Sequence, residues 1–196
     1  MHHLSSAELE AGLDYVREAP RDEGIVALIV RRPAVDEREV VAEARLQAGA
    51  GLVGDTWPVR SGKSSPDPDR QLTVMNNRAA LLVADEPHRR QLAGDQLYVD
   101  LDLSTANLPA GTRLEVGSAV IEVTSPPHLG CVKFAARFGH DAWRFVNSRV
   151  GRELRLRGLN ARIVRSGTVR EGDRIRKLPL IQESVPPART VTRLRD

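Results

Sequence analysis

One cysteine, Cys131, stands in a segment whose neighbours favour a reactive thiol. The segment reads Ser125-Pro-Pro-His-Leu-Gly-Cys-Val-Lys-Phe134 and holds the only thiol of the chain, with His128 and Lys133 close in sequence. The thiolate is the nucleophilic and metal-binding form of cysteine, and nearby cations stabilise it. Gly130 has no side chain, so a ligand can approach the sulfur closely. A buried packing role is the alternative, because free cysteine is often buried.

Other site chemistries find little support. His128 and Cys131 have the spacing of half a zinc site, but there is no second cysteine, and nothing places His88 or His140 beside them. The chain contains no G-x-S-x-G nucleophile motif, no Walker motif and no dinucleotide-binding glycine pattern. These classes of enzyme are therefore set aside.

Composition indicates one soluble domain. The chain has 196 residues, 41% hydrophobic and 28% charged, with a mean hydropathy of -0.32. No run reaches the roughly 20 apolar residues of a membrane-spanning helix, and the first residues lack the pattern of a signal peptide. We expect a cytoplasmic protein that does not bind a membrane.

Basic residues gather in the C-terminal third. From Arg144 to Lys177 there are eleven basic and three acidic residues, although the whole chain carries only +3. Such a surface is a candidate for binding anions, and a solvated arginine-rich face is the alternative interpretation.

Apolar patterns divide the chain into short elements. Leucine and valine at helical spacing predict a helix over 4–18, with Ser5 or Ser6 as its cap. β-branched or alternating runs predict strands, and Gly117-Ser118 predicts a tight hairpin turn. The predicted strands cover residues 24–31, 38–46, 71–75, 97–103, 113–116, 119–124, 160–165 and 174–178.

Two more helices and a long loop complete the prediction. Residues 77–84 form a short helix capped by an asparagine, and 141–157 form a longer one ended by Gly158. Residues 49–70 are rich in Gly, Ser, Pro and Asp and predict an irregular loop.

Hairpins with so few helices do not fit alternating βαβ units. We predict a mainly β (α+β) fold, a closed or partly closed β-barrel with a few peripheral helices. The predicted divisions are a helical extension over 1–23, a barrel domain over 24–178 and a tail over 179–196, either a surface strap or disordered.

Several short stretches follow one another along the chain in an order that is typical of a known domain family. Gly94-Asp-Gln-Leu-Tyr-Val-Asp-Leu-Asp-Leu-Ser104 is followed by Leu108-Pro-Ala-Gly-Thr-Arg-Leu-Glu-Val-Gly117 and by the strand that leads to Cys131. Gly54-Asp55 and Arg70-Gln-Leu-Thr-Val74 precede them, and the segments 157–164 and 172–173 follow. In order and spacing these stretches resemble the MOSC domain, named for the C-terminus of molybdenum cofactor sulfurase.

This resemblance implies a β-barrel that binds the molybdenum cofactor (molybdopterin). It implies that Cys131 is catalytic and either ligates molybdenum or carries sulfur as a persulfide. The implied enzyme is a molybdopterin-dependent reductase of N-hydroxylated compounds or a sulfur transferase for metal-sulfur centres. Its implied partners are a small-molecule substrate and an electron-transfer or sulfur-donor protein. Pyridoxal phosphate binding is a further association of the family.

Candidate cofactor contacts lie around the junction that follows the long loop. Arg70, Thr73 and Arg78 surround a predicted strand-to-helix junction, where an anion can meet a helix N-terminus. Lys63, His128 and Lys133 complete the predicted set. The alternative is that these are ordinary solvated loop and helix-start residues.

The chain also departs from the family pattern. Thr56 and Trp57 follow Gly54-Asp55, where small bacterial members commonly have a histidine. The approach to Cys131 through Pro126, Pro127 and His128 differs from the usual acidic, proline-containing one.

Two other functions stay open. One is a non-catalytic module that binds a phosphorylated ligand or nucleic acid through the arginine-rich third, although only 4% of residues are aromatic, which disfavours nucleic acid. The other is a thiol redox sensor that uses Cys131 without a metal.

Overall fold

Seven strands pair edge to edge and form a closed β-barrel. The structure is a computed structural model that describes residues 3–59 and 66–179. The order around the barrel is β1, β6, β5, β9, β8, β7 and β11, and β11 pairs with β1 to close it. Only β5 and β6 run parallel among these pairs. The mainly β barrel with a few helices is therefore confirmed.

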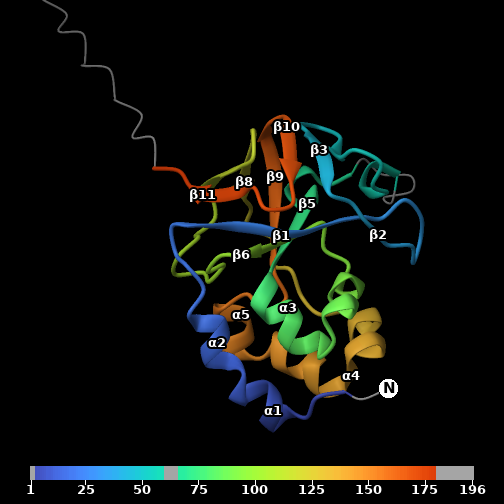
Figure 1. Ribbon diagram of the computed structural model, residues 1–196, viewed down its shortest axis with the longest axis vertical. Coiled ribbons are helices and arrows are strands. Elements are labelled where there is room, and N and C mark those ends of the chain that lie inside the picture. Colours follow the sequence, from blue (N-terminus) through green and yellow to red (C-terminus); the bar gives the residue numbers. More distant parts are fainter. Residues whose placement is uncertain (1–2, 60–65, 180–196) are drawn as a thin grey trace, which may run out of the picture.

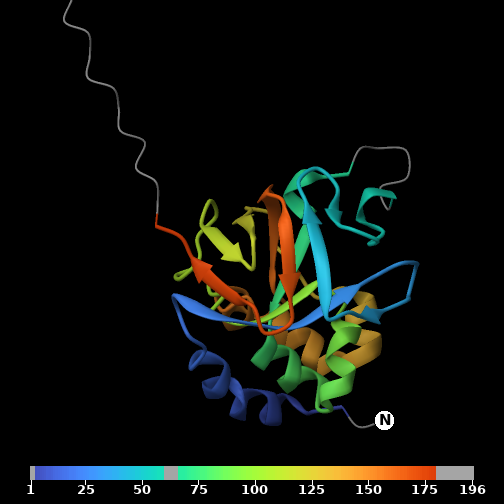
Figure 2. The same cartoon turned by 45° about the horizontal axis from the view of Figure 1, so that its top comes forward.

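The strands are short, as a small barrel requires. Those of the barrel are β1 (Glu23–Arg31), β5 (Leu72–Asn76), β6 (Leu97–Asp100), β7 (Arg113–Val116), β8 (Ala119–Val123), β9 (Leu159–Arg165) and β11 (Arg174–Lys177). Strand β2 (Glu39–Val40) extends the sheet beside β1. A second sheet holds β10 (Gly167–Arg170), β3 (Glu43–Gln47) and β4 (Gly51–Leu52), and its strands lie beside the barrel in Figures 1 and 2.

Apolar side chains fill the barrel, so it is a packed core and not a channel. Leu72, Leu97, Val99, Ile121 and Ile175 are fully buried and belong to one cluster there. Because the interior is occupied, a ligand must bind outside the barrel.

The helices gather on one side of the barrel (Figure 1). A second apolar cluster joins them to it, and Leu28, Met75 and Tyr98 from the strands meet Phe134 and Phe138 from α4. The helical elements are α1 (Ser6–Ala11), α2 (Leu13–Arg17), η1 (Trp57–Val59), η2 (Pro68–Arg70), α3 (Asn77–Ala84), η3 (Pro87–Ala93), α4 (Val132–Asn147) and α5 (Arg149–Glu153).

The helix expected over 141–157 is wrong in its bounds. Helix α4 begins directly after Cys131, and α5 starts again after Ser148, whose side chain caps it. Phe134, Phe138 and Ala142 are buried at spacings of four, so the helical pattern starts earlier than predicted. A break at Gly139, with φ 89°, interrupts that pattern.

Several strand predictions also need correction. The strand expected over 38–46 is split into β2 and β3, which pair with different partners. Strand β10 was not expected, and β6 ends at Asp100 instead of residue 103. Tyr98 is buried instead of alternating towards solvent, because its hydroxyl accepts a hydrogen bond from the Asp95 amide. The predicted N-terminal helix is interrupted at Gly12, between α1 and α2.

Within the described segments, we find no helix whose length and apolar character would let it cross a membrane.

Gly158 allows β9 to approach β5 closely. Its φ is +104°, and a Cβ there would lie 2.4 Å from the Val74 carbonyl oxygen. Gly172 has a similar φ of +86° but open space around it.

We predict that Gly172→Ala lowers the free energy of unfolding by about 1 kcal/mol through backbone strain alone. Gly158→Ala should lower it by about 3 kcal/mol, because the clash with Val74 is added to the strain. Urea denaturation measures both, and equal losses would contradict the close approach.

Candidate functional site

A cavity of about 430 Å³ lies beside Cys131. It is bordered by the loop after β1, η1 and η2, the start of β5, the turn before β6, and the segment that leads into α4. Six of the described side chains that line it are cationic: Arg32, Arg38, Arg70, Lys133, Arg137 and Arg157. The lining also includes Trp57, Thr73, His128 and Asn160. Its size is that of a small-molecule site.

Cys131 is exposed and occupies the N-cap position of α4, without a capping hydrogen bond from its side chain. Desolvation alone would raise the pKa of its thiol. The backbone N–H groups of Phe134 and Lys133 and the charge of Arg157 act in the opposite direction, and the pKa lies below its ordinary value. The structure therefore favours the thiolate, which is the form that binds a soft metal or attacks an electrophile.

A buried carboxylate, Asp95, anchors the wall next to this thiol. Its side chain is 0% exposed and forms ion pairs with Arg157 and with His128 Nε2, the latter at 2.8 Å. Burial alone would raise the pKa of Asp95, but these two partners lower it to about 2. Burial and the charge of Arg157 also lower the pKa of His128, although Asp95 opposes them. The array is thus an arginine cation, a carboxylate and a neutral imidazole.

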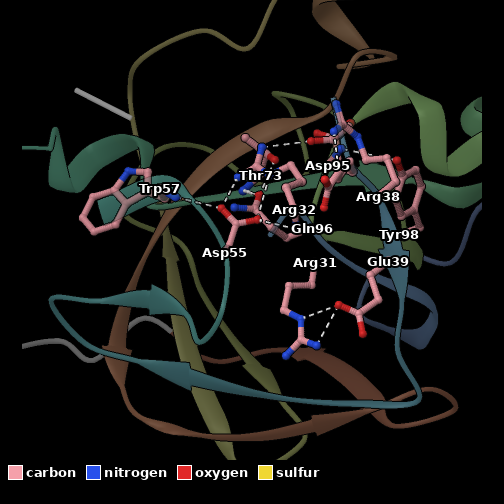
Figure 3. Close-up of polar contacts among 12 residues, drawn as sticks. Arg31, Arg32, Arg38, Glu39, Asp55, Trp57, Thr73, Asp95, Gln96 and Tyr98 are labelled. Carbon is pink, nitrogen blue, oxygen red and sulfur yellow. Dashed lines mark hydrogen bonds and ion pairs between the residues drawn. The ribbon is translucent and has the colours of Figure 1, made fainter. Parts of the chain in front are cut away.

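A second buried pair lies next to this group. Arg32 binds the Asp55 carboxylate through two nitrogens, Nε at 2.7 Å and Nη2 at 2.8 Å, and its Nη1 donates to the Gly94 carbonyl. The Trp57 amide donates to the same carboxylate, as Figure 3 shows. Asp55 thereby holds Trp57 at the cavity and neutralises Arg32.

Arg38 differs from the other arginines of the cavity because it has no ion pair among the described residues, although its Nη1 donates to the Glu37 carbonyl. Desolvation, and then the charges of Arg137 and Arg32, hold the pKa of Arg38 below its ordinary value. Its Nε is buried without a hydrogen-bond partner, and so is Nε of Arg157. Gly94 makes room for this guanidinium, since a Cβ there would lie 3.2 Å from Nη2. A surplus cation with an unsatisfied donor is suited to an anionic ligand.

The structure brings five of the predicted site residues to this one cavity. Cys131, His128, Lys133, Arg70 and Thr73 all line it. Arg70 is half exposed and lies 3.3 Å from Asp67, and the Thr73 hydroxyl donates to Gln96. Lys133 donates to Asp36, which also accepts from Arg137.

Arg78 is not part of this cavity lining. Its Nε lies 2.6 Å from Asp100, and its guanidinium stacks on Tyr15 at 4.9 Å. The Asn76 side chain accepts from the first amides of α3, so it occupies the place predicted for an anion. Lys63 lies outside the described residues.

Arg32, Arg38 and Arg157 were not among the predicted contacts. Arg32 pairs with Asp55 and Arg157 with Asp95, and each aspartate follows a glycine in a stretch already singled out in the sequence. Buried acids next to such glycines indicate that arginine partners exist, but only the fold shows which ones.

Behind the segment 126–129 lies a smaller cavity of about 280 Å³. His128 and Leu129 line both cavities, so this segment is the wall between them.

The arginine-rich third is largely paired with acids. Glu115 accepts from Arg165 and Arg176, and Glu122 binds Arg113 and Arg162. Arg170 and Arg174 lie near Glu43 and Glu23. These pairs offset much of the local surplus, which weakens the interpretation of this face as a nucleic-acid surface.

Comparisons with known proteins agree with this architecture. The model of the MOSC domain family matches residues 61–176. YiiM from Escherichia coli has a TM-score of 0.54 at 21% identity over 79% of this chain and 70% of that chain. The YUAD protein from Bacillus subtilis has a TM-score of 0.55 at 17% identity, covering 78% and 94%. A crystal structure titled as a hypothetical protein reaches 0.59 at 22% identity, covering 86% and 73%. No curated protein matches. At these identities the structures show the fold alone.

The Cys131 thiol offers a direct test of the electrostatics, because it is the only thiol. The rate of its alkylation by iodoacetamide rises with pH as the thiol loses its proton. We predict that the midpoint of this rise lies at a lower pH in the folded protein than in the chain unfolded in guanidinium chloride, because the unfolded chain lacks the amide and arginine contacts. Identical midpoints in the two states would contradict a stabilised thiolate.

The buried array predicts an acid-sensitive stability. Asp95 has a folded pKa of about 2 against an ordinary value of 3.8. A lowered folded pKa gives a contribution that is complete above the unfolded value and is lost as pH falls through the folded one. We predict that the free energy of unfolding falls between about pH 4 and pH 2, and that Asp95→Asn removes this part of the slope. Asp67→Asn, at an exposed pair, is the control. A wild-type slope retained by Asp95→Asn contradicts the assignment.

Proposed function

Because this chain belongs to the MOSC domain family, we propose that it binds the molybdenum cofactor in the cavity beside Cys131 and reduces N-hydroxylated compounds there. One observation carries the proposal. A single exposed thiol, whose pKa is lowered, shares a cavity with two arginines whose buried Nε atoms have no partner.

The cationic wall fits an anionic cofactor. Asp55 and Asp95 neutralise Arg32 and Arg157, whereas Asp36 serves both Lys133 and Arg137, and Arg38 has no acid of its own. The wall therefore keeps a positive surplus that the phosphate of molybdopterin would balance. Arg38 is the main candidate contact, with Arg70, Thr73 and Lys133 as further lining groups.

The ligand set fits a metal that arrives with ligands of its own. Within the described residues, no group of three or more His, Cys, Asp or Glu side chains could hold a metal ion. Cys131 supplies one soft sulfur, which suits molybdenum bound by a cofactor better than a metal caged by protein alone.

When bound, the cofactor would supply two-electron redox chemistry, while the chain supplies binding and orientation. Trp57 and Leu129 supply apolar surface to the cavity lining. Reducing equivalents would come from an electron-transfer protein. A persulfide carrier for metal-sulfur centres is the alternative use of the same thiol, and it predicts sulfur on Cys131 without tightly bound molybdenum.

The test is metal content after expression in a host that makes molybdopterin. We predict stoichiometric molybdenum by elemental analysis in the wild type and a loss of more than tenfold in Cys131→Ser, because no second thiol can replace the ligand. Arg38→Gln should weaken cofactor binding by about tenfold, as expected for one charge-assisted hydrogen bond.

Arg149→Gln is the matched control, because it removes an arginine of α5 that pairs with Glu153 outside the cavity. Wild-type protein that binds no molybdenum after reconstitution with cofactor would overturn the proposal. Sulfur released by cyanide from a molybdenum-free protein would instead support the persulfide carrier.

A further inference from the structure

His128 is the histidine of the cavity and has a fixed set of hydrogen-bonding atoms. Its Nε2 lies 2.8 Å from Asp95 Oδ1, and the side chain is 17% exposed. The same carboxylate binds Arg157, so it stays ionised and can only accept. Nε2 must therefore carry the proton of this hydrogen bond.

Nδ1 is consequently the free atom of the ring. Nδ1 has no hydrogen-bond partner in the described part of the chain, and it is not among the buried atoms that lack one, so it remains accessible. Burial and the charge of Arg157 keep the pKa of His128 low, which favours a neutral ring with an unprotonated Nδ1. A neutral imidazole nitrogen in this state is a hydrogen-bond acceptor.

Among the described residues that line this cavity, the side chains besides His128 that can accept a hydrogen bond are those of Asp67, Thr73, Cys131 and Asn160. Its arginines and its lysine can only donate. The Asp67 carboxylate lies at the exposed edge, near Arg70 and bonded to the Asp69 amide. Within residues 128–131, Nδ1 of His128 and the sulfur of Cys131 are the two side-chain acceptors.

We propose that His128 determines specificity by accepting, at Nδ1, a hydrogen bond from the O–H of an N-hydroxylated ligand, with Asp95 and Arg157 as the groups that fix its tautomer. This inference rests on the proposed function, because it names the part of the substrate that the cavity recognises. Amidoximes and hydroxylamines carry such a donor beside the nitrogen–oxygen bond, whereas their O-methyl ethers lack the O–H.

Two measurements test the proposal on the full-length protein. Nitrogen-15 spectra of the imidazole rings should show His128 protonated at Nε2 and bare at Nδ1 at neutral pH. In titrations with acetamidoxime and O-methylacetamidoxime, we expect the wild type to prefer the amidoxime by about tenfold, the size of one hydrogen bond.

Variants separate recognition from folding. His128→Phe keeps an aromatic ring but no acceptor, so its preference should fall to about onefold; His128→Gln keeps a donor for Asp95 and a carbonyl acceptor, and should restore part of it. His88→Phe, an exposed histidine paired with Glu86, is the matched control and should keep the full preference. Thermal unfolding of each variant checks that it is folded.

The outcomes are distinct from those of the cofactor test. A proton on Nδ1, no preference in the wild type, or an undiminished preference in His128→Phe would each overturn the role of His128. Preference without molybdenum in the same samples would overturn the proposed cofactor and retain this role, whereas molybdenum without preference would do the reverse.

Discussion

The site depends on one buried charge, the carboxylate of Asp95. A carboxylate with 0% exposure costs several kcal/mol to desolvate unless partners compensate it. Arg157 and His128 are those partners, and they come from the turn before β9 and from the segment that leads into α4. Three parts of the chain that lie far apart in sequence must therefore meet at the Asp95 carboxylate. The position of Cys131, three residues after His128, follows from that requirement.

The need to compensate each buried carboxylate also explains why one arginine of the cavity remains available. Asp55 is buried and bound by Arg32, just as Asp95 is bound by Arg157, so each buried acid uses one guanidinium. Arg38 lies near these groups without an acid of its own, and burial together with Arg137 and Arg32 makes its charge costly. A bound anion would offset that cost. The unfavourable cation is thus an argument for a ligand, in a way that an exposed, paired arginine such as Arg149 is not.

Local patterns predicted most strands and the barrel, because β-branched runs and the Gly117-Ser118 turn are short-range signals. They failed where the pattern was interrupted. The backbone of α4 is broken at Gly139, and the start of this helix at Val132, directly after Cys131, was missed, and with it the backbone N–H groups that lower the pKa of the thiol. Among the site residues, the sequence placed Cys131 and His128 by proximity, and the structure gathers Arg70, Thr73 and Lys133 with them. It missed Arg32 and Arg157, because which arginine meets which buried acid depends on contacts 23 and 62 residues apart in the chain. It also missed Arg38, whose place in the cavity only the fold shows.

The packed barrel separates stability from chemistry. Its interior is filled by apolar side chains, so the cavity is built from connections outside it: the loop after β1, the turn before β6 and the segment before α4. Solved structures with only 17% to 22% identity share the fold, which shows that the barrel tolerates wide substitution. Connections are less constrained by core packing than strands are. The residues that precede the cysteine, here Pro126, Pro127 and His128, can therefore be substituted without changing the scaffold. The character of this site then lies in the hydrogen-bonding atoms that those few residues present, and in the buried Asp95 that holds them in place.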